Sequence, residues 1–223
     1  ATSWGVSTRL IGALIMVHGD DKGLRLPPNI APIQIVIVPI YKNDEDKEKI
    51  NNYLNSVIEF CKKSQISYYL DHRAKLSPGF KFNEWEMKGV PLRMEVGPRD
   101  VENNEVVLVR RDNGEKLSLG KNELKSKIFN LLDEIQLSLF NQAKSFREDN
   151  IHSASSYDEF KDIVSSGGFI RCGWDGDAET EAAIKNDTKA TIRCIPFDEQ
   201  TDGLICIYSG KPAKHEVIYA KAY

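Results

Sequence analysis

The hydrophobic positions of the chain fall into three groups, separated by polar or Gly/Pro-rich segments. The first group is the run LIGALIMV at residues 10–17, which predicts an apolar helix or strand. It is followed by GDDKGLRLPPNIAP, whose glycines and prolines are typical of a linker. Because the run has no apolar segment nearby to pack against, we expect residues 1–31 to be the end of a larger unit and the chain to be a fragment.

The second group begins with IQIVIVPI at residues 33–40, a β-branched run that predicts a buried parallel strand. An amphipathic helix with acidic residues in its first turn is expected next. Short β-rich segments follow at 67–73, 90–97 and 103–119, the last with an Asn-Gly turn that predicts a hairpin. A long amphipathic helix is expected over 121–148. This order predicts an α/β domain at 32–148, with a mixed sheet covered by helices.

The third group, residues 149–223, predicts a small α+β domain. Ser156 and Glu159 form a capping-box pattern before a short helix, and Gly167 is a stop signal after it. Strands are expected at FIRCGW, TIRCIPF, GLICIYSG and EVIYAKAY.

Composition limits the classes of function. With 223 residues and a net charge of −3, the chain is long enough for one large or two small domains and is not a polycation. Contact with nucleic acid must therefore be local. The longest apolar run is well short of the ~20 residues of a membrane span, so no membrane contact is expected. The four cysteines form no CxxC pair, which favours a reducing cytoplasm.

Two stretches could carry chemistry. Arg9 lies beside small residues and could clamp a phosphate, although a surface ion pair is the more ordinary interpretation. His18 beside Asp20 is more simply a turn histidine. Residues 71–100 interleave aromatic and basic residues with acids, a pattern suited to stacking and pairing with single-stranded RNA. The alternative is a solvated amphipathic helix packed on a sheet. No Ser/His/Asp set or phosphate-binding glycine loop is present, so a self-contained enzyme is not predicted.

Several motifs resemble one known family in its own order. TSWGVSTRLIG looks like the third signature motif of class II aminoacyl-tRNA synthetases in its prolyl form. LPPNIAPIQIVIVPI, SPGFKFNEWEMKGVPLRMEVGPRD and the terminal AKAY resemble the anticodon-binding domain and C-terminal extension of prolyl-tRNA synthetase of the archaeal/eukaryote-like type. The resemblance implies the last strand and helix of a catalytic domain at 1–31, an anticodon-binding domain at 32–148, and a zinc-ribbon-like C-terminal domain at 149–223.

The resemblance also implies roles for individual residues. Arg9 matches the motif 3 arginine that contacts ATP phosphate, and it is the expected catalytic residue. Ser7 lies where the nucleotide is held, and Ser3, Trp4 and Gly5 match the floor of the proline pocket. The expected readers of the two guanines shared by proline anticodons are Glu86, Arg93, Arg99 and Asp100, with Lys116 as a weaker match. Carboxylates suit the guanine N1 and N2 donors, and arginines suit O6 and N7.

The sequence departs from the family at a zinc site. Many relatives ligate zinc with four cysteines. Cys172 and Cys206 match two of these positions, but Asp177 and Ser209 occupy the other two, and neutral Ser is a poor zinc ligand. We therefore expect no metal there, and expect Cys61 and Cys194 to be buried apolar residues. The C-terminal VIYAKAY, ending in Tyr223, should be ordered, because in the family this terminus folds back towards the active site.

The resemblance implies a proline–tRNA ligase that uses ATP with Mg²⁺, binds tRNA(Pro) and proline, and dimerises through its catalytic domains, with the fragment alone inactive. Two alternatives stay open. One is a non-catalytic RNA-binding module derived from a synthetase. The other is a class II synthetase for another amino acid, which TSWG followed by STR disfavours.

Overall fold

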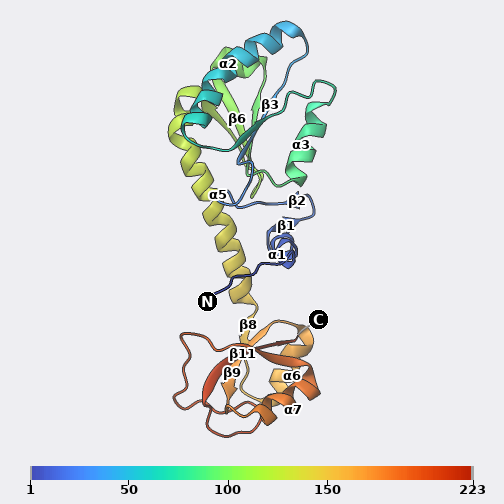
Figure 1. Cartoon of the computed structure of the whole chain (residues 1–223), viewed down its shortest axis with the longest axis vertical. Coiled ribbons are helices and arrows are strands. Elements are labelled where there is room, and N and C mark those ends of the chain that lie inside the picture. The colour runs from blue at the N-terminus through green and yellow to red at the C-terminus, as the bar shows by residue number, and fades with distance from the viewer. Residues whose placement is uncertain (1, 222–223) are drawn as a thin grey trace. The chain divides into compact units, whose positions relative to one another are not determined.

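The structure is a computed structural model that describes residues 2–221, and the chain divides into two compact units (Figure 1). The first unit extends to residue 143 and the second begins at residue 144. Tyr223 lies outside the described residues, so its expected placement stays a prediction.

The first unit is built on a five-stranded sheet. Its spatial order is β4 (Tyr68–Leu70), β3 (Ile35–Pro39), β5 (Leu92–Val96), β6 (Glu105–Arg110) and β7 (Lys116–Gly120). β3 pairs in parallel with β4 and β5, whereas β5–β6 and β6–β7 are antiparallel. The expected mixed α/β sheet is therefore confirmed, and β3 is fully buried because it has a neighbour on each side and helices on both faces.

Two helices cover one face of this sheet. They are α2 (Asp44–Lys63), which begins where the Asn43 side chain accepts the Asp46 N–H at 2.7 Å, and α5 (Lys121–Asp149). Their apolar stripes pack on the side chains of alternate strand residues, as periodicities of 3.6 and 2 require. The core includes Ile35, Ile37, Leu54, Leu92, Met94, Leu108, Ile128 and Ile135.

A single helix, α3 (Pro78–Met87), lies on the opposite face. Ser77 caps it by accepting the Phe80 N–H, and Pro78 occupies the first turn, where a missing N–H costs nothing. Trp85 of α3 packs on Val36 and Val38 of β3 and on Val90. A short helix, α4 (Pro98–Asn103), follows β5 at the other end of that strand.

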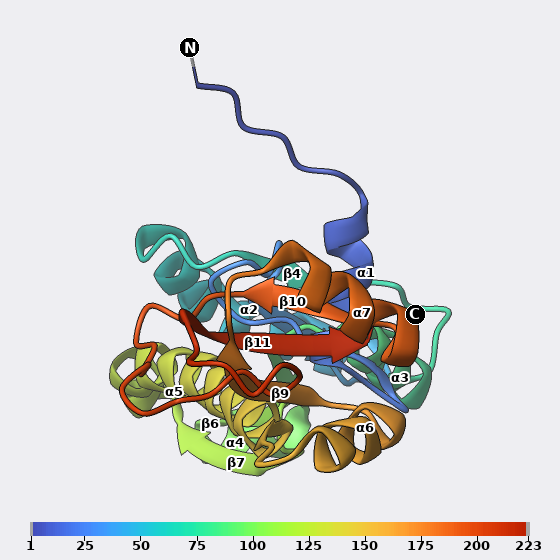
Figure 2. The same cartoon turned by 90° about the horizontal axis from the view of Figure 1, so that it is seen from below.

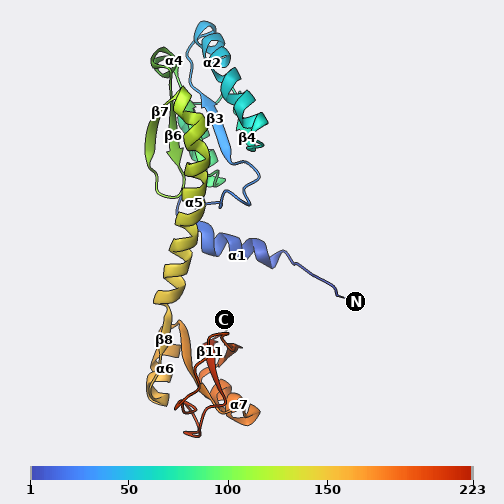
Figure 3. The ribbon, with the colours of Figure 1, turned by 90° about the vertical axis from the view of Figure 1, so that its left-hand side faces the viewer.

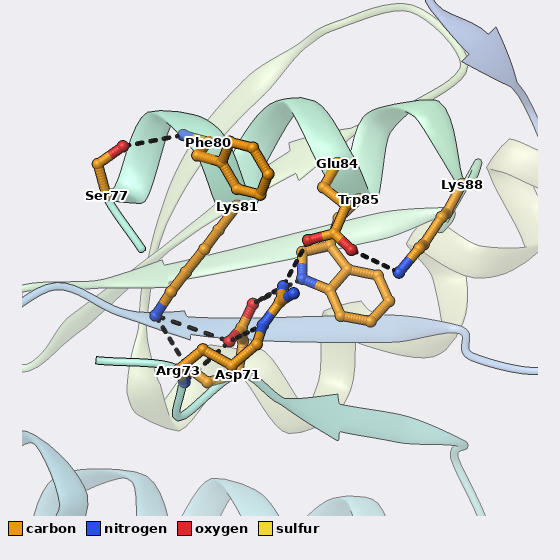
Figure 4. Close-up of polar contacts among 8 residues, drawn as sticks. All are labelled: Asp71, Arg73, Ser77, Phe80, Lys81, Glu84, Trp85 and Lys88. Carbon is orange, nitrogen blue, oxygen red and sulfur yellow. Dashed lines mark hydrogen bonds and ion pairs between the residues drawn. The ribbon is translucent and has the colours of Figure 1, made fainter. Parts of the chain in front are cut away.

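The buried carboxylate of Asp71, just after β4, fastens α3 to the sheet (Figure 4). Arg73 donates to it twice, from Nε at 3.0 Å and from a terminal nitrogen at 2.7 Å, and Trp85 Nε1 donates at 2.8 Å. Lys81 Nζ lies 3.7 Å away and donates to the Asp71 carbonyl at 3.1 Å. Burial alone would raise the pKa of Asp71, but the hydrogen bonds from Arg73 and Trp85 and the Lys81 charge hold it below its usual range.

The N-terminal apolar run forms a helix, α1 (Arg9–His18), followed by a hairpin of β1 (Gly19–Asp20) and β2 (Gly23–Leu24). Figure 3 shows α1 standing clear of the five-stranded sheet. None of its residues is buried, and Leu10, Ile11 and Met16 are exposed.

The second unit has a four-stranded sheet in the order β10 (Ala190–Cys194), β11 (His215–Lys221), β9 (Phe169–Trp174), β8 (Ile151–Ser153). Figure 2 shows β10, β11 and β9 side by side; only the β8–β9 pair is parallel. The helices are α6 (Tyr157–Ser166) and α7 (Ala178–Thr188). The core forms around Phe160 and Tyr219, whose rings meet edge to face at 5.3 Å.

Two sequence-based expectations in this unit are wrong. GLICIYSG forms turns and isolated bridges instead of a strand, because β8 pairs with residues 169–171 of β9 and leaves only the end of that edge, where Cys206 bridges Gly173. Cys206 N donates to the Lys211 carbonyl at 2.7 Å and so closes a local turn. Cys194 is exposed, because β10 is an edge strand whose register shifts between Ile192 and Cys194; Cys61 is buried as expected.

Replacing Asp71 with Asn should destabilise the first unit by about 3–5 kcal/mol at neutral pH, since Arg73 and Lys81 would lose their buried counter-ion. The folded pKa of Asp71 is depressed, so its contribution is present above the unfolded pKa of ~3.9 and is lost as pH falls towards the folded value. Urea unfolding with peptide-resolved hydrogen exchange would measure both effects. Exposed Asp133→Asn is the matched control, and equal unfolding midpoints for the two variants would contradict this role for Asp71.

Candidate nucleic-acid interface

The sheet face that carries α3 is only partly covered by that helix. α3 packs on β3, while alternate residues of β5, β6 and β7 on the same side form what we term the open face. The register aligns Arg93 with Val109 and Lys116, and Glu95 with Val107 and Ser118. The open face thus presents two cations, a carboxylate, a hydroxyl and two small apolar side chains.

Glu95 organises the charges of the open face. Its Oε1 accepts from Arg93 Nε at 3.0 Å, and its Oε2 pairs with Lys116 Nζ at 3.0 Å. The Arg93 guanidinium also lies over the Phe82 ring, 4.4 Å from its centroid, and so is held by an ion pair and by a cation–π contact. Two cations share one carboxylate, which leaves the open face locally positive.

A pocket of about 260 Å³ lies at the edge of the open face. Its volume is below the roughly 300–1,000 Å³ of sites for drug-sized ligands, and it suits one base. Its lining includes the carboxylate of Glu86 and the guanidinium of Arg93, and the other lining residues include Lys22, Trp85, Val109 and Gly114. An acceptor and a fork of donors therefore converge in one place.

The β1–β2 hairpin is docked beside this pocket by Arg111. The Arg111 guanidinium binds both Asp20 oxygens, at 2.6 and 2.9 Å, and its Nε donates to the Glu86 carbonyl at 2.9 Å. The hydrogen bond from Arg111 lowers the pKa of Asp20 to about 2, so this pair is ionised at neutral pH. Lys22 Nζ lies 3.3 Å from a Glu86 oxygen.

Two glycines allow this docking. Gly23 has φ +128°, and a Cβ there would lie 2.4 Å from the Met87 carbonyl oxygen; Gly89 has φ +75°, and its Cβ would lie 2.6 Å from the Leu24 side chain. Leu26 N also donates to the Gly89 carbonyl at 3.1 Å. The backbones of the hairpin and of the end of α3 therefore touch directly.

The predicted anticodon residues occupy two places. Glu86 and Arg93 line the pocket, and Lys116 is joined to Arg93 through Glu95. Arg99 and Asp100 lie in α4, beyond the opposite end of β5. Arg99 is exposed, whereas Asp100 Oδ2 accepts the Gly97 N–H at 2.7 Å and caps α4.

The predicted ATP and proline residues lie outside the open face. Ser3, Trp4, Gly5 and Ser7 follow one another on a non-helical segment, and Arg9 is the first residue of α1. Their side chains are exposed, Trp4 by 92%. The structure brings them together through sequence proximity only.

The degenerate zinc positions of the second unit make other contacts. Asp177 caps α7 by accepting the Glu179 N–H at 2.9 Å, and Ser209 Oγ donates to Asp175 Oδ2 at 2.6 Å. Cys172 and Cys206 are buried free thiols. Within residues 2–221 no group of three or more His, Cys, Asp or Glu side chains could hold a metal. These donors do not fit a closed tetrahedral zinc site.

Sequence reasoning missed Glu95, Arg111 and Lys22. Strand alternation places Glu95 on the same face as Arg93, so the period of two could have found it. Arg111 and Asp20 are 91 positions apart in sequence, and no local signal pairs them.

Comparison with known proteins fits this geometry. Residues 34–131 match a family model described as anticodon binding domain, and residues 157–223 match one described as prolyl-tRNA synthetase, C-terminal. Curated relatives named proline–tRNA ligase align with the whole chain: 48% identical in Bacteroides fragilis, 49% in Amoebophilus asiaticus and 50% in Cytophaga hutchinsonii. The chain belongs to the prolyl-tRNA synthetase family. It spans 45–46% of the length of these relatives and matches their C-terminal part.

The anticodon-binding match of this synthetase family includes all five predicted guanine readers but not the β1–β2 hairpin, which precedes residue 34. The part of the chain that the structure describes contains no helix long and apolar enough to cross a membrane.

Gly23→Ala should detach the hairpin from α3, because both the positive φ and the Met87 contact oppose a side chain. The matched control is Gly114→Ala, which has φ +76° but nothing within 4 Å of the new Cβ. We expect Gly114→Ala to cost about 1 kcal/mol and Gly23→Ala at least twice as much. Thermal unfolding and limited proteolysis of residues 19–26 would compare them. If Gly23→Ala and Gly114→Ala lost the same stability, the close contact with Met87 would not contribute to the effect.

Proposed function

We propose that this chain is the C-terminal part of a proline–tRNA ligase, in which it supplies motif 3 and recognition of the tRNA(Pro) anticodon. The observation that carries the proposal is the convergence of Glu86 and Arg93 in one pocket beside the open face. Apart from Lys22, the residues that line this pocket lie within the matched anticodon-binding region of a chain that is about half identical to proline–tRNA ligases.

The pocket chemistry suits guanine. A carboxylate accepts the N1 and N2 protons that guanine alone presents together, and the Arg93 fork can donate to O6 and N7. Trp85 and Val109 supply apolar walls. Arg99 and Asp100 would take the second guanine at the other end of β5, with Asp100 Oδ1 as acceptor because Oδ2 caps α4. Lys116 would pair with RNA beside the pocket.

In the full-length enzyme, proline would react with ATP to give prolyl-adenylate and then be transferred to the 3′ end of the tRNA. Arg9 would offset the charge that develops at the α-phosphate, close to Ser7, and Ser3, Trp4 and Gly5 would line the proline pocket. Mg²⁺ supplies charge neutralisation when it is bound with ATP, and we assign none of its ligands to this chain. In this proposal, residues 1–31 end the catalytic domain, residues 32–148 form the anticodon-binding domain, and residues 149–223 form the C-terminal domain.

We further propose that the full-length enzyme is a cytoplasmic homodimer that forms through its catalytic domains. Proline-dependent ATP–pyrophosphate exchange by the full gene product separates the ligase from a non-catalytic RNA-binding module, which would give none.

Arg93→Gln should weaken binding of this chain to an RNA hairpin with a proline anticodon by ~1–3 kcal/mol, because one bidentate base contact is lost. Binding to the same hairpin with both guanines replaced by adenine should change little. Lys63→Ala, on α2 at the opposite face, is the control for loss of one positive charge. Titration with each RNA at fixed salt would give the affinities of the wild-type chain, Arg93→Gln and Lys63→Ala. If Arg93→Gln lost the same affinity for both RNAs, Arg93 would be assigned to phosphate contact.

We also propose that the second unit folds without zinc, supported by the Ser209–Asp175 and Thr180–Asp175 hydrogen bonds. Ser209→Ala should lower its free energy of unfolding by about 1–3 kcal/mol, because a charged acceptor loses a donor. A strong chelator should leave the melting temperature of the wild-type chain unchanged. Elemental analysis that finds one zinc per chain, with destabilisation by the chelator, would refute this proposal.

A further inference from the structure

The Glu86 carboxylate has a partner from outside the anticodon-binding match. Lys22, at the tip of the β1–β2 hairpin, places Nζ 3.3 Å from Glu86 Oε1 and lines the same pocket. Its side chain is 69% exposed, so this ion pair is accessible to a ligand.

The Glu86 backbone is held by a more buried set of contacts. The Arg111 side chain is only 6% exposed, donates to the Glu86 carbonyl and is fixed by both oxygens of Asp20. Asp20 belongs to the same hairpin as Lys22. The hairpin therefore contacts Glu86 twice, once at its carboxylate and once, through Arg111, at its backbone.

We propose that the β1–β2 hairpin is a wall of the guanine pocket: Asp20, through Arg111, positions Glu86, while Lys22 pairs with the Glu86 carboxylate in the free chain and leaves it for RNA phosphate when RNA of any sequence binds. This inference rests on the proposed recognition of guanine by Glu86. Asp20 and Arg111 are positioning residues, because neither contacts the base.

The two contacts differ in the way this exchange requires. An exposed lysine–carboxylate pair contributes little free energy, so RNA phosphate can draw Lys22 away and guanine N1 and N2 donors can take its place on Glu86 at little cost. The bidentate, largely buried Asp20–Arg111 pair is stronger and directional. The Glu86 carboxylate is thus paired with Lys22 before binding and with guanine after it. Its position on α3 stays the same in both states.

Anchoring of the hairpin supports a fixed wall. Arg25, directly after β2, donates from a terminal nitrogen to Gln142 Oε1 of α5 at 2.9 Å. This bond and the close backbone contacts at Gly23 and Gly89 hold the hairpin at three places in the first unit.

The test uses the 223-residue chain and four RNA hairpins: one with a proline anticodon, two with either shared guanine replaced by adenine, and one with both replaced. Discrimination is the ratio of the affinities for the proline-anticodon hairpin and for a hairpin with one guanine replaced. Asp20→Asn should reduce this ratio at least fivefold for one of the two guanines. Its affinity for the doubly replaced hairpin should equal that of the wild-type chain. Arg111→Lys, which keeps the charge but loses the fork, should do the same. Melting temperatures confirm that each variant is folded.

Lys22→Ala should keep the discrimination, weaken binding to all four hairpins by the same factor, and reduce the slope of log affinity against log salt by about 1. Lys63→Ala, equal in charge change, should alter neither quantity. Wild-type discrimination retained in both Asp20→Asn and Arg111→Lys would overturn the positioning role. A wild-type chain that binds all four hairpins equally would instead overturn the proposed function itself.

Discussion

The arrangement of the first unit depends on the burial of one carboxylate, Asp71. A charge at that depth is tolerated only with compensating donors, and the Arg73 fork and the Trp85 indole supply them. Trp85 belongs to α3, so its hydrogen bond to Asp71 fixes the position of the helix along β3. The position of the C-terminal end of α3 relative to the sheet follows from this. The last residues of α3 carry Glu86, and the position of the pocket therefore follows from a hydrogen-bonding requirement several residues away.

Because only one helix covers that face, the sheet is asymmetric. The face beneath α2 and α5 is a continuous apolar core, while β5–β7 on the other side keep polar side chains, of which Arg93 contacts α3 through the Phe82 ring. Such a surface offers charges and small apolar areas that are held in place by strand pairing. A rigid sheet positions Arg93 more closely than a loop could, which suits discrimination between bases over general attraction to RNA.

The sequence was sufficient to predict those helices and strands that are determined by local hydrophobic patterns. IQIVIVPI predicted the buried strand, and the periodic 121–148 segment predicted α5. GLICIYSG carried a strand pattern but formed turns, because strand order, which sequence does not show, gives most of that edge of β9 to β8 and leaves one bridge to Gly173. Asp177 was interpreted as a degenerate ligand position, although Asp followed by AETEAA is also an N-cap signature, and α7 begins there. The contacts of Lys22 and Arg111 join distant segments and needed the fold. The roles assigned to Arg9 and the guanine readers remain predictions of the family resemblance.

The acidic groups of the interface differ in how their partners are held, and this difference bears on recognition. Glu86 and Glu95 each have one exposed lysine partner, Lys22 and the 61% exposed Lys116, which solvent and RNA phosphate can reach. Each is also tied to an arginine that is mostly buried, Arg111 through the Glu86 backbone and Arg93 through the Glu95 carboxylate. An approaching polyanion competes for the lysines, since these pairs are weak and screened, and leaves the arginines in place. Under the proposed function, attraction to RNA and the geometry of base reading would therefore be carried by different cations, so that the first would vary with salt without disturbing the second.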